Sequence, residues 1–168
     1  MAEMENENKI LDFDTIQEKR TDELMELLDR RDMKQLQRRM EEMNEFDVAE
    51  FLSELDSSRM PMVFRLLSKE TAAEVFANFD APEQEEIINS ITDSELAGIM
   101  DEMYVDDAVD MMEELPANVV KRAMRTATPA TRNLINQSHR YPDHSAGSIM
   151  TAEFIDLKKY MSVKESLA

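Results

Sequence analysis

Apolar residues recur along the middle of the chain with a period of 24 residues, the spacing of Ala49, Ala73, Ala97 and Lys121. When each of these residues is counted as position 1 of a repeat, apolar side chains occupy positions 0, 3, 4 and 7. This spacing places them on one face of a helix. A second apolar stripe follows at positions 12, 15, 16 and 19. Each repeat therefore predicts two short amphipathic helices.

The pattern is complete in three copies and weaker at both ends. In the fourth copy the second stripe contains Arg132, Asn136 and His139, and an earlier copy that starts at Met25 keeps only part of the pattern. Helices of two or three turns are marginal in water on their own, so neighbouring repeats must stack on one another. The sequence therefore predicts an all-α fold, an armadillo-like α-solenoid of about five short helix pairs.

Residues that favour helix starts lie between the stripes. Ser68 and Thr92 are expected to begin the first helices of their repeats, and Thr92 forms a capping box with Glu95. The second helices are expected to start near three segments with N-cap and first-turn chemistry: Asp56–Ser58, Asp80–Pro82 and Thr128–Pro129. These signals divide the repeats into helices of two to three turns joined by tight turns.

The last part of the chain is different. Pro142 and Gly147 mark a turn-rich connector, Glu153–Leu157 has the pattern of a short strand, and Ser162 with Glu165 forms a capping box before a last helix. We therefore predict an acidic tail and lead-in helix at 1–19, helical repeats at 20–139 and a connector at 140–152. Residues 153–168 would be the truncated start of a second, α/β domain, so the chain is expected to be a fragment.

Charge and composition exclude several classes of function. The 168 residues carry 37 acidic and 19 basic side chains, a formal net charge of −18, which argues against nucleic-acid binding because phosphates require clustered Lys and Arg. The absence of Cys excludes disulfide and thiolate sites, and the 2 Gly exclude glycine-rich phosphate loops. No apolar run approaches the roughly 20 residues of a membrane span, so we expect no membrane insertion. No catalytic arrangement stands out, and an enzyme is not expected.

The most informative polar cluster is Asp106, Asp107 and Asp110. Asp106 and Asp110 are four residues apart, so they share a helix face, and the apolar stripe directs that face outward. They repel each other at this spacing, and a divalent cation such as Mg²⁺ or Ca²⁺ would relieve the repulsion. Alternatively, Asp106 and Asp107 only stabilise the start of a helix through its dipole. Glu74 lies off the stripe of its own helix and is expected to be exposed.

Together these segments resemble the cytosolic N-terminal region of MgtE-type magnesium transporters. The resemblance is carried by the 24-residue repeat, Thr71–Phe76, Asp106–Asp110 with Glu114–Pro116 after it, and Tyr141–Thr151. The tail from Glu153 to Ala168 resembles the opening strand and helix of the first CBS domain of that family. The resemblance implies a right-handed superhelix on the cytoplasmic face of a bacterial membrane. Two CBS domains and a transmembrane region that forms a homodimer would follow it.

The resemblance also implies a mechanism and a set of ligands. In that family, Mg²⁺ bound between the acidic faces of the N domain and the CBS domains holds the pore closed. The ligands implied here are oxygen donors: Glu74, Asp106, Asp110, the weaker candidate Asp107, and a backbone carbonyl near Gly147 and Ser148. The CBS carboxylates lie outside this chain, so half-formed sites are expected. His144 stands where similar sequences often carry an acidic residue, which would remove a ligand or add a pH dependence.

A function of a different class stays open. The N domain of that family is similar in architecture to armadillo-like modules of the bacterial flagellar rotor switch protein, which bind protein partners and sense no ion. Such a scaffold would present an apolar or mixed-charge groove, and its stability would not depend on Mg²⁺.

Overall fold

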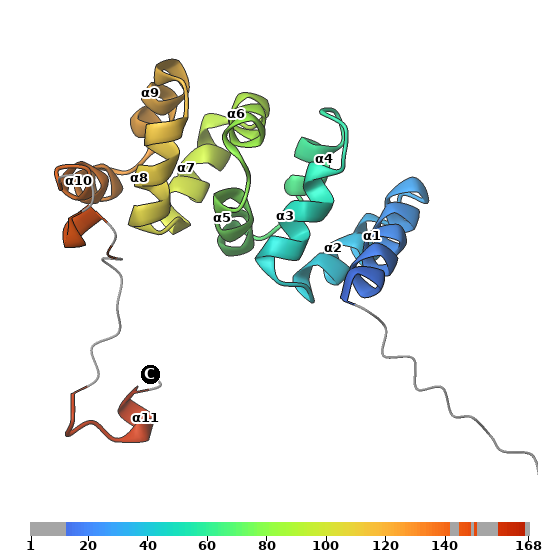
Figure 1. The fold of residues 1–168 in the computed structure, drawn as a ribbon, viewed down its shortest axis with the longest axis horizontal. Helices are drawn as coiled ribbons and strands as arrows, with labels where there is room; N and C mark the ends of the chain where they lie inside the picture. Colours follow the sequence, from blue (N-terminus) through green and yellow to red (C-terminus); the bar gives the residue numbers. More distant parts are fainter. Residues whose placement is uncertain (1–12, 142–144, 149, 151–157, 167–168) are drawn as a thin grey trace, which may run out of the picture. The chain divides into compact units, whose positions relative to one another are not determined.

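A computed structural model describes residues 13–141, 145–148, 150 and 158–166 (Figure 1). Every regular element in these ranges is helical, which agrees with the predicted all-α fold; the expected strand at 153–157 lies outside them. The helices are α1 (Phe13–Asp29), α2 (Met33–Glu41), α3 (Glu45–Ser53), α4 (Met60–Phe64), α5 (Lys69–Ala77), α6 (Ala81–Ser90), α7 (Asp93–Glu102), α8 (Val105–Glu114), α9 (Ala117–Thr126), α10 (Pro129–Ser138), the 3₁₀ helix η1 (Ala146–Ser148) and α11 (Val163–Ser166).

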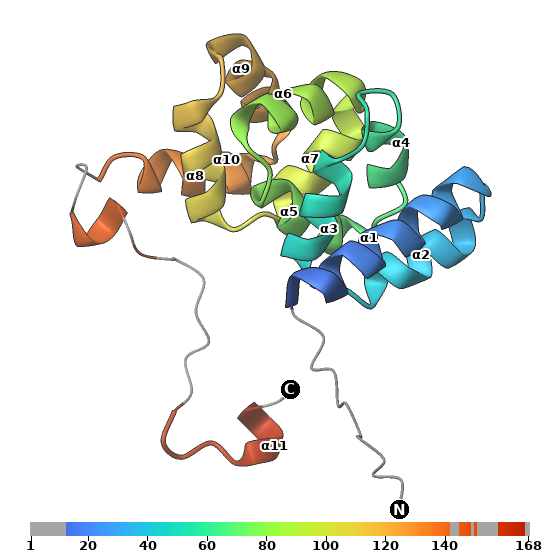
Figure 2. The same ribbon diagram turned by 45° about the vertical axis from the view of Figure 1, so that its right-hand side comes forward.

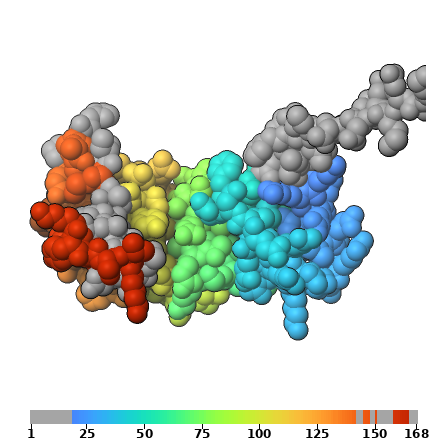
Figure 3. All heavy atoms as spheres, turned by 90° about the horizontal axis from the view of Figure 1, so that it is seen from below, coloured from blue at the N-terminus to red at the C-terminus, as the bar shows by residue number. Residues whose placement is uncertain are grey.

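The chain divides into two compact units, Met1–Phe79 and Asp80–Ala168. In the first unit α1 packs against α2, and α3 packs against both α4 and α5. α1 and α2 lie side by side in Figures 1 and 2. Figure 3 draws the heavy atoms of this unit as spheres, in colours that run from blue through cyan to green.

The core of the first unit is built from the predicted stripes. Phe51, Leu52, Phe64 and Phe76 are each at most 3% exposed. The ring of Phe64 lies 6.5 Å from that of Phe76 and 6.1 Å from that of Phe79, in tilted arrangements. Aromatic pairs at this separation add to the free energy that burial alone contributes.

The second unit contains α6 to α11. Here α7 and α6 both pack against α9, and α8 packs against α10, beside which it lies in both ribbon views (Figures 1 and 2). Leu96, Met100, Ile87 and Ile135 are almost completely buried, again at stripe positions. Periodicity therefore predicts the buried faces correctly in both units, whereas the stacking of the repeats into a solenoid and the domain limits stay predictions.

Most predicted helix starts are confirmed as N-caps. The side chains of Ser68 and Thr128 each accept a hydrogen bond from the backbone N–H three residues later. Asp80 and Thr92 do the same, and each forms a full capping box with the glutamate at the third helical position. These caps satisfy amide groups that would otherwise have no partner at the helix ends.

Asp56 makes the same kind of bond, but not to α4. Its Oδ1 accepts from the N–H of Arg59, three residues later, at 3.1 Å and from that of Ser58 at 2.9 Å, so it caps the turn that precedes the helix. α4 then begins after Arg59, which makes no side-chain cap, and has 5 residues rather than two to three turns. The chain must leave this helix early because Ser68 already adopts the extended conformation of the next N-cap.

The degraded fourth repeat has a structural reason. Arg132 replaces an apolar stripe residue, and its guanidinium Nη1 donates to the carbonyl oxygens of Met124 at 3.2 Å, Arg125 at 3.3 Å and Ala127 at 3.0 Å. These carbonyls belong to the last turn and C-cap of α9 and have no partner within the helix. The polar residue therefore caps a helix end.

No helix in the described ranges has the length and apolar character needed to cross a bilayer.

Candidate acidic site

α8 presents the three candidate aspartates. Its buried residues are Val105, Ala108 and Met111, so the side of the helix that carries them faces the core. Asp106 and Asp107 lie in the first turn, and the N-cap Tyr104 makes no side-chain hydrogen bond there. The helix dipole makes this end favourable for negative charge.

Asp106 is not simply exposed, which corrects the sequence-based expectation. The residue is half-buried, and its Oδ1 is shielded from solvent with no hydrogen-bond partner among the described residues. Helical periodicity identifies the side of a helix that faces its core, but it carries no information about what surrounds the first turn. A shielded carboxylate oxygen without a hydrogen-bond partner is costly.

Asp110 and Glu74 are exposed, as predicted. Neither carboxylate makes an ion pair with a described residue; the backbone carbonyl of Glu74 accepts a hydrogen bond from Asn78 Nδ2 at 2.9 Å. Asp107 is half-buried and already engaged in an interaction. Asp110 and Glu74 thus remain available to an external ligand, whereas Asp106 is partly shielded and Asp107 is already engaged.

The candidates do not assemble into a complete metal centre. No group of three or more His, Cys, Asp or Glu side chains within the described ranges is placed to hold a metal ion. Glu74 belongs to the first unit, and Asp106 and Asp110 belong to the second. The backbone of Ser148 ends the 3₁₀ helix η1, whereas its side chain and His144 lie outside the described part.

The acidic character is concentrated in one stretch of sequence. Residues 70–114 contain fifteen Asp or Glu and no Lys, Arg or His. The following stretch, 115–141, has the opposite composition, with five Lys or Arg and no carboxylate. The separation of acidic from basic residues can be read from the sequence, but the 24-residue period of apolar residues does not reveal it.

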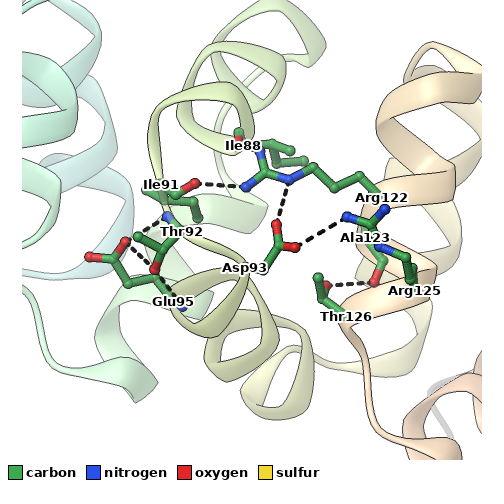
Figure 4. Close-up of polar contacts among 9 residues, drawn as sticks. All are labelled: Ile88, Ile91, Thr92, Asp93, Glu95, Arg122, Ala123, Arg125 and Thr126. Carbon is green, nitrogen blue, oxygen red and sulfur yellow. Dashed lines mark hydrogen bonds and ion pairs between the residues drawn. The ribbon is translucent and has the colours of Figure 1, made fainter.

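The cations of α9 are used to hold the second unit together (Figure 4). Arg122 Nε donates to Asp93 Oδ1 at 2.9 Å, and its two other nitrogens donate to the carbonyl oxygens of Ile88 and of Ile91, the latter at 2.8 Å. Arg125 Nη2 donates to Asp93 Oδ2 at 3.1 Å. The hydrogen bond from Arg122 is the main reason that the pKa of Asp93 lies below its ordinary value of 3.8.

A weaker contact joins the acidic helix to α10. His139 Nδ1 lies 3.7 Å from Glu113 Oε1, and both side chains are more than half exposed. His139 is therefore a surface histidine. None of these cations approaches Asp106 or Asp110 closely enough to form an ion pair in the described structure.

The first unit contains a small polar hollow between α1 and α2. It has a volume of about 150 Å³ and is lined mainly by Arg20, Glu23, Arg39 and Glu42. Arg39 already pairs with Glu23 at 2.7 Å and with Glu42 at 3.3 Å. Pockets for small molecules usually measure about 300–1,000 Å³, so this hollow does not constitute a convincing ligand site.

Comparisons with known proteins identify similar sequences and folds. The sequence model of one family, described as the MgtE intracellular N domain, matches residues 43–144. The magnesium transporter MgtE of Thermus thermophilus is 30% identical over 156 residues, which cover 90% of this chain and 34% of that protein. The chain thus spans about a third of the length of this curated relative.

Two solved structures share the fold. The crystal structure of the soluble part of a magnesium transporter has a TM-score of 0.74 at 23% identity, covering 83% of this chain and 55% of that one. The cytosolic domain of the Mg²⁺ channel MgtE in complex with ATP has a TM-score of 0.72 at 29% identity, covering 88% and 60%.

Proposed function

Because the chain belongs to the MgtE family and contains its intracellular N domain, we propose that it is the cytosolic Mg²⁺-sensing part of a magnesium transporter or channel. The whole protein would be an integral membrane protein, and this region would lie on its cytoplasmic side. The proposed role is regulatory and involves no catalysis. The related proteins, a magnesium transporter and the cytosolic domain of a Mg²⁺ channel, support this assignment.

One observation connects the proposed function with particular residues. Asp110 is exposed on α8 without an ion pair to a described residue, and Asp106, one turn earlier, has an Oδ1 that makes no hydrogen bond within the described ranges. Carboxylate oxygens are the donors that Mg²⁺ prefers, and Mg²⁺ commonly takes only one or two of them and keeps several waters. The residues present therefore fit one half of a Mg²⁺ site.

The proposed mechanism follows from charge. Without Mg²⁺, the carboxylates of residues 70–114 repel an acidic partner surface, which we assign to the CBS domains of the same homodimeric protein. Asp106 and Asp110, with Asp107 as the weaker ligand, would hold Mg²⁺, whose positive charge would let the two surfaces approach and would so favour the closed pore. Glu74 and the Ser148 carbonyl would serve further bridging ions. Docking and Mg²⁺ affinity must then strengthen each other by linkage.

The experiment is a Mg²⁺ titration of the ¹⁵N-labelled chain, followed by NMR against NaCl of matched ionic strength. We expect amide shifts specific to Mg²⁺ around Asp106 and Asp110. They should disappear in the double variant Asp106→Asn/Asp110→Asn and persist in Glu85→Gln/Glu86→Gln, which removes the same charge from α6. Shifts equal to those caused by NaCl would contradict the proposal and favour an interaction scaffold.

A further inference from the structure

Tyr141 lies directly against Gly147 in the segment that follows α10. A Cβ atom added to Gly147 would lie 2.3, 2.5 and 2.8 Å from the Cδ1, Cγ and Cε1 atoms of the Tyr141 ring. Cβ atoms in real proteins essentially never come this close to another heavy atom. The ring therefore occupies the space that any other side chain at position 147 would need.

The backbone conformation does not explain this glycine. Gly147 does not have a positive φ, so its backbone conformation is one that any residue can adopt. It is the middle residue of η1, and an alanine in a compatible conformation ordinarily stabilises a protein slightly. Glycine is required here because the Tyr141 ring approaches its Cα.

Tyr141 is itself fixed to the end of α10. Its N–H donates to the Ser138 carbonyl at 3.1 Å, and the N–H of Arg140 donates to the Gln137 carbonyl at 3.3 Å. The Tyr141 side chain is 39% exposed, so more than half of its surface is covered. A path of contacts thus runs from α10, which packs on the acidic helix α8, through Tyr141 to the backbone of η1.

We propose that Tyr141 is a positioning residue: its ring, seated on Gly147, holds η1 at the end of α10 and so fixes the direction of the Ser148 carbonyl. This carbonyl is a Mg²⁺ ligand in the proposed function, so the expected effect of Tyr141 on Mg²⁺ binding rests on that proposed function. The contact between Tyr141 and Gly147 forms without Mg²⁺. The contact and its effect on Mg²⁺ binding can therefore be tested separately.

The first test uses the composition of the chain, which has only two glycines, Gly98 and Gly147. Glycine-selective labelling then gives two sets of NMR signals, and Gly98 in α7 is the internal control. A ring placed over Gly147 shifts its Hα signals upfield. We expect this displacement in the Mg²⁺-free chain, its retention in Tyr141→Phe and its loss in Tyr141→Ala. A Gly147 signal that is unchanged in Tyr141→Ala would overturn the contact.

The second test is a double-mutant cycle. Gly147→Ala should displace the ring and accelerate tryptic cleavage after the exposed Arg140. In a Tyr141→Ala background the same substitution meets no ring, so it should cause no further acceleration. Equal acceleration in both backgrounds would show that Gly147→Ala acts on the backbone alone and would overturn the inference.

The link to Mg²⁺ is tested by repeating the titration in both Tyr141 variants. We expect Tyr141→Ala to keep the Mg²⁺ response of the Asp106 amide and to lose that of Gly147, and Tyr141→Phe to keep both. A Gly147 response that persists in Tyr141→Ala would overturn the positioning role. Absence of any Mg²⁺ response in the parent chain would instead overturn the proposed function, while the Mg²⁺-free glycine spectra still decide whether the contact exists.

Discussion

Asp106 and Asp110 occupy equivalent places in the helical pattern, yet their surroundings differ. Asp106 has a shielded oxygen without a hydrogen bond in the described structure, whereas Asp110 is exposed to solvent. Removing a carboxylate oxygen from water without a compensating hydrogen bond is costly, and an exposed oxygen carries no such cost. Of the two residues, Asp106 therefore has the less favourable surroundings.

The first prediction concerns this cost. In Mg²⁺-free buffer, Asp106→Ala should raise the free energy of unfolding by about 1 kcal/mol. The expected gain combines the removal of an unpartnered shielded oxygen, ~1–3 kcal/mol, with the loss of a favourable charge in the first turn, ~0.3–1 kcal/mol. Urea denaturation measures it, and Asp110→Ala is the exposed control, for which a smaller change is expected. A destabilised Asp106→Ala would contradict the prediction.

At the level of single residues, the sequence predicted the candidates but not their environments. Counting around the helix placed Asp106 and Asp110 on one face and Glu74 off the apolar stripe, and the exposure of Asp110 and Glu74 agrees. The shielding of the Asp106 oxygen was missed, because periodicity does not describe what lies around a helix end. The contact between Tyr141 and Gly147 was missed for a related reason: a glycine in a connector first suggests a turn.

At the level of helices, the repeat pattern predicted most of the fold. Apolar residues at positions 3 and 4 of each repeat, such as Phe51 and Phe76, are typical of the buried face of an amphipathic helix. Arg132 could not be interpreted in the same way. Its position showed only that an apolar residue was missing, and its bonds to the carbonyls at the end of α9 depend on the three-dimensional arrangement.

The second prediction concerns the contacts of Asp93. Because folding lowers the pKa of this carboxyl, its contribution to stability is present above its ordinary pKa and is lost as the pH falls through the lowered value. Asp93→Asn should therefore be less stable than the parent chain at pH 7. The difference should shrink below about pH 4, near the ordinary pKa of an aspartate.

Urea denaturation of both proteins over this pH range measures the difference. Asp110→Asn is the matched control, since it removes an aspartate that has no ion pair within the described ranges. A deficit of Asp93→Asn that stays constant down to pH 2.5 would show that the charge of Asp93 does not matter to its contacts with Arg122 and Arg125.

At the level of the whole chain, charge is both large and unevenly distributed. The formal net charge is −18, and residues 70–114 contribute fifteen carboxylates without one cation. Repulsion of this kind opposes the compact state. It is also the property that the proposed function uses, because the same carboxylates would keep an acidic partner away until Mg²⁺ binds.

The third prediction follows from this repulsion. Raising NaCl from about 0.01 M to about 0.1 M shortens the Debye length from about 30 Å to about 10 Å and should raise the melting temperature. The increase should be smaller in Glu85→Lys, which reduces the charge of the acidic stretch, than in Glu50→Lys, in a segment that already contains cations. Thermal unfolding by circular dichroism measures it. A melting temperature that falls with salt would show that ion pairs outweigh repulsion.

Arg122 has a consequence for how the second unit opens. Its guanidinium, attached to α9, bonds to two carbonyls at the end of α6 and to the first residue of α7. If α9 detached, both carbonyls and the Asp93 carboxylate would lose their partner at the same moment. Fraying of any one of these helices is thus coupled to the other two, and their amide hydrogens are expected to exchange with solvent as one cooperative group.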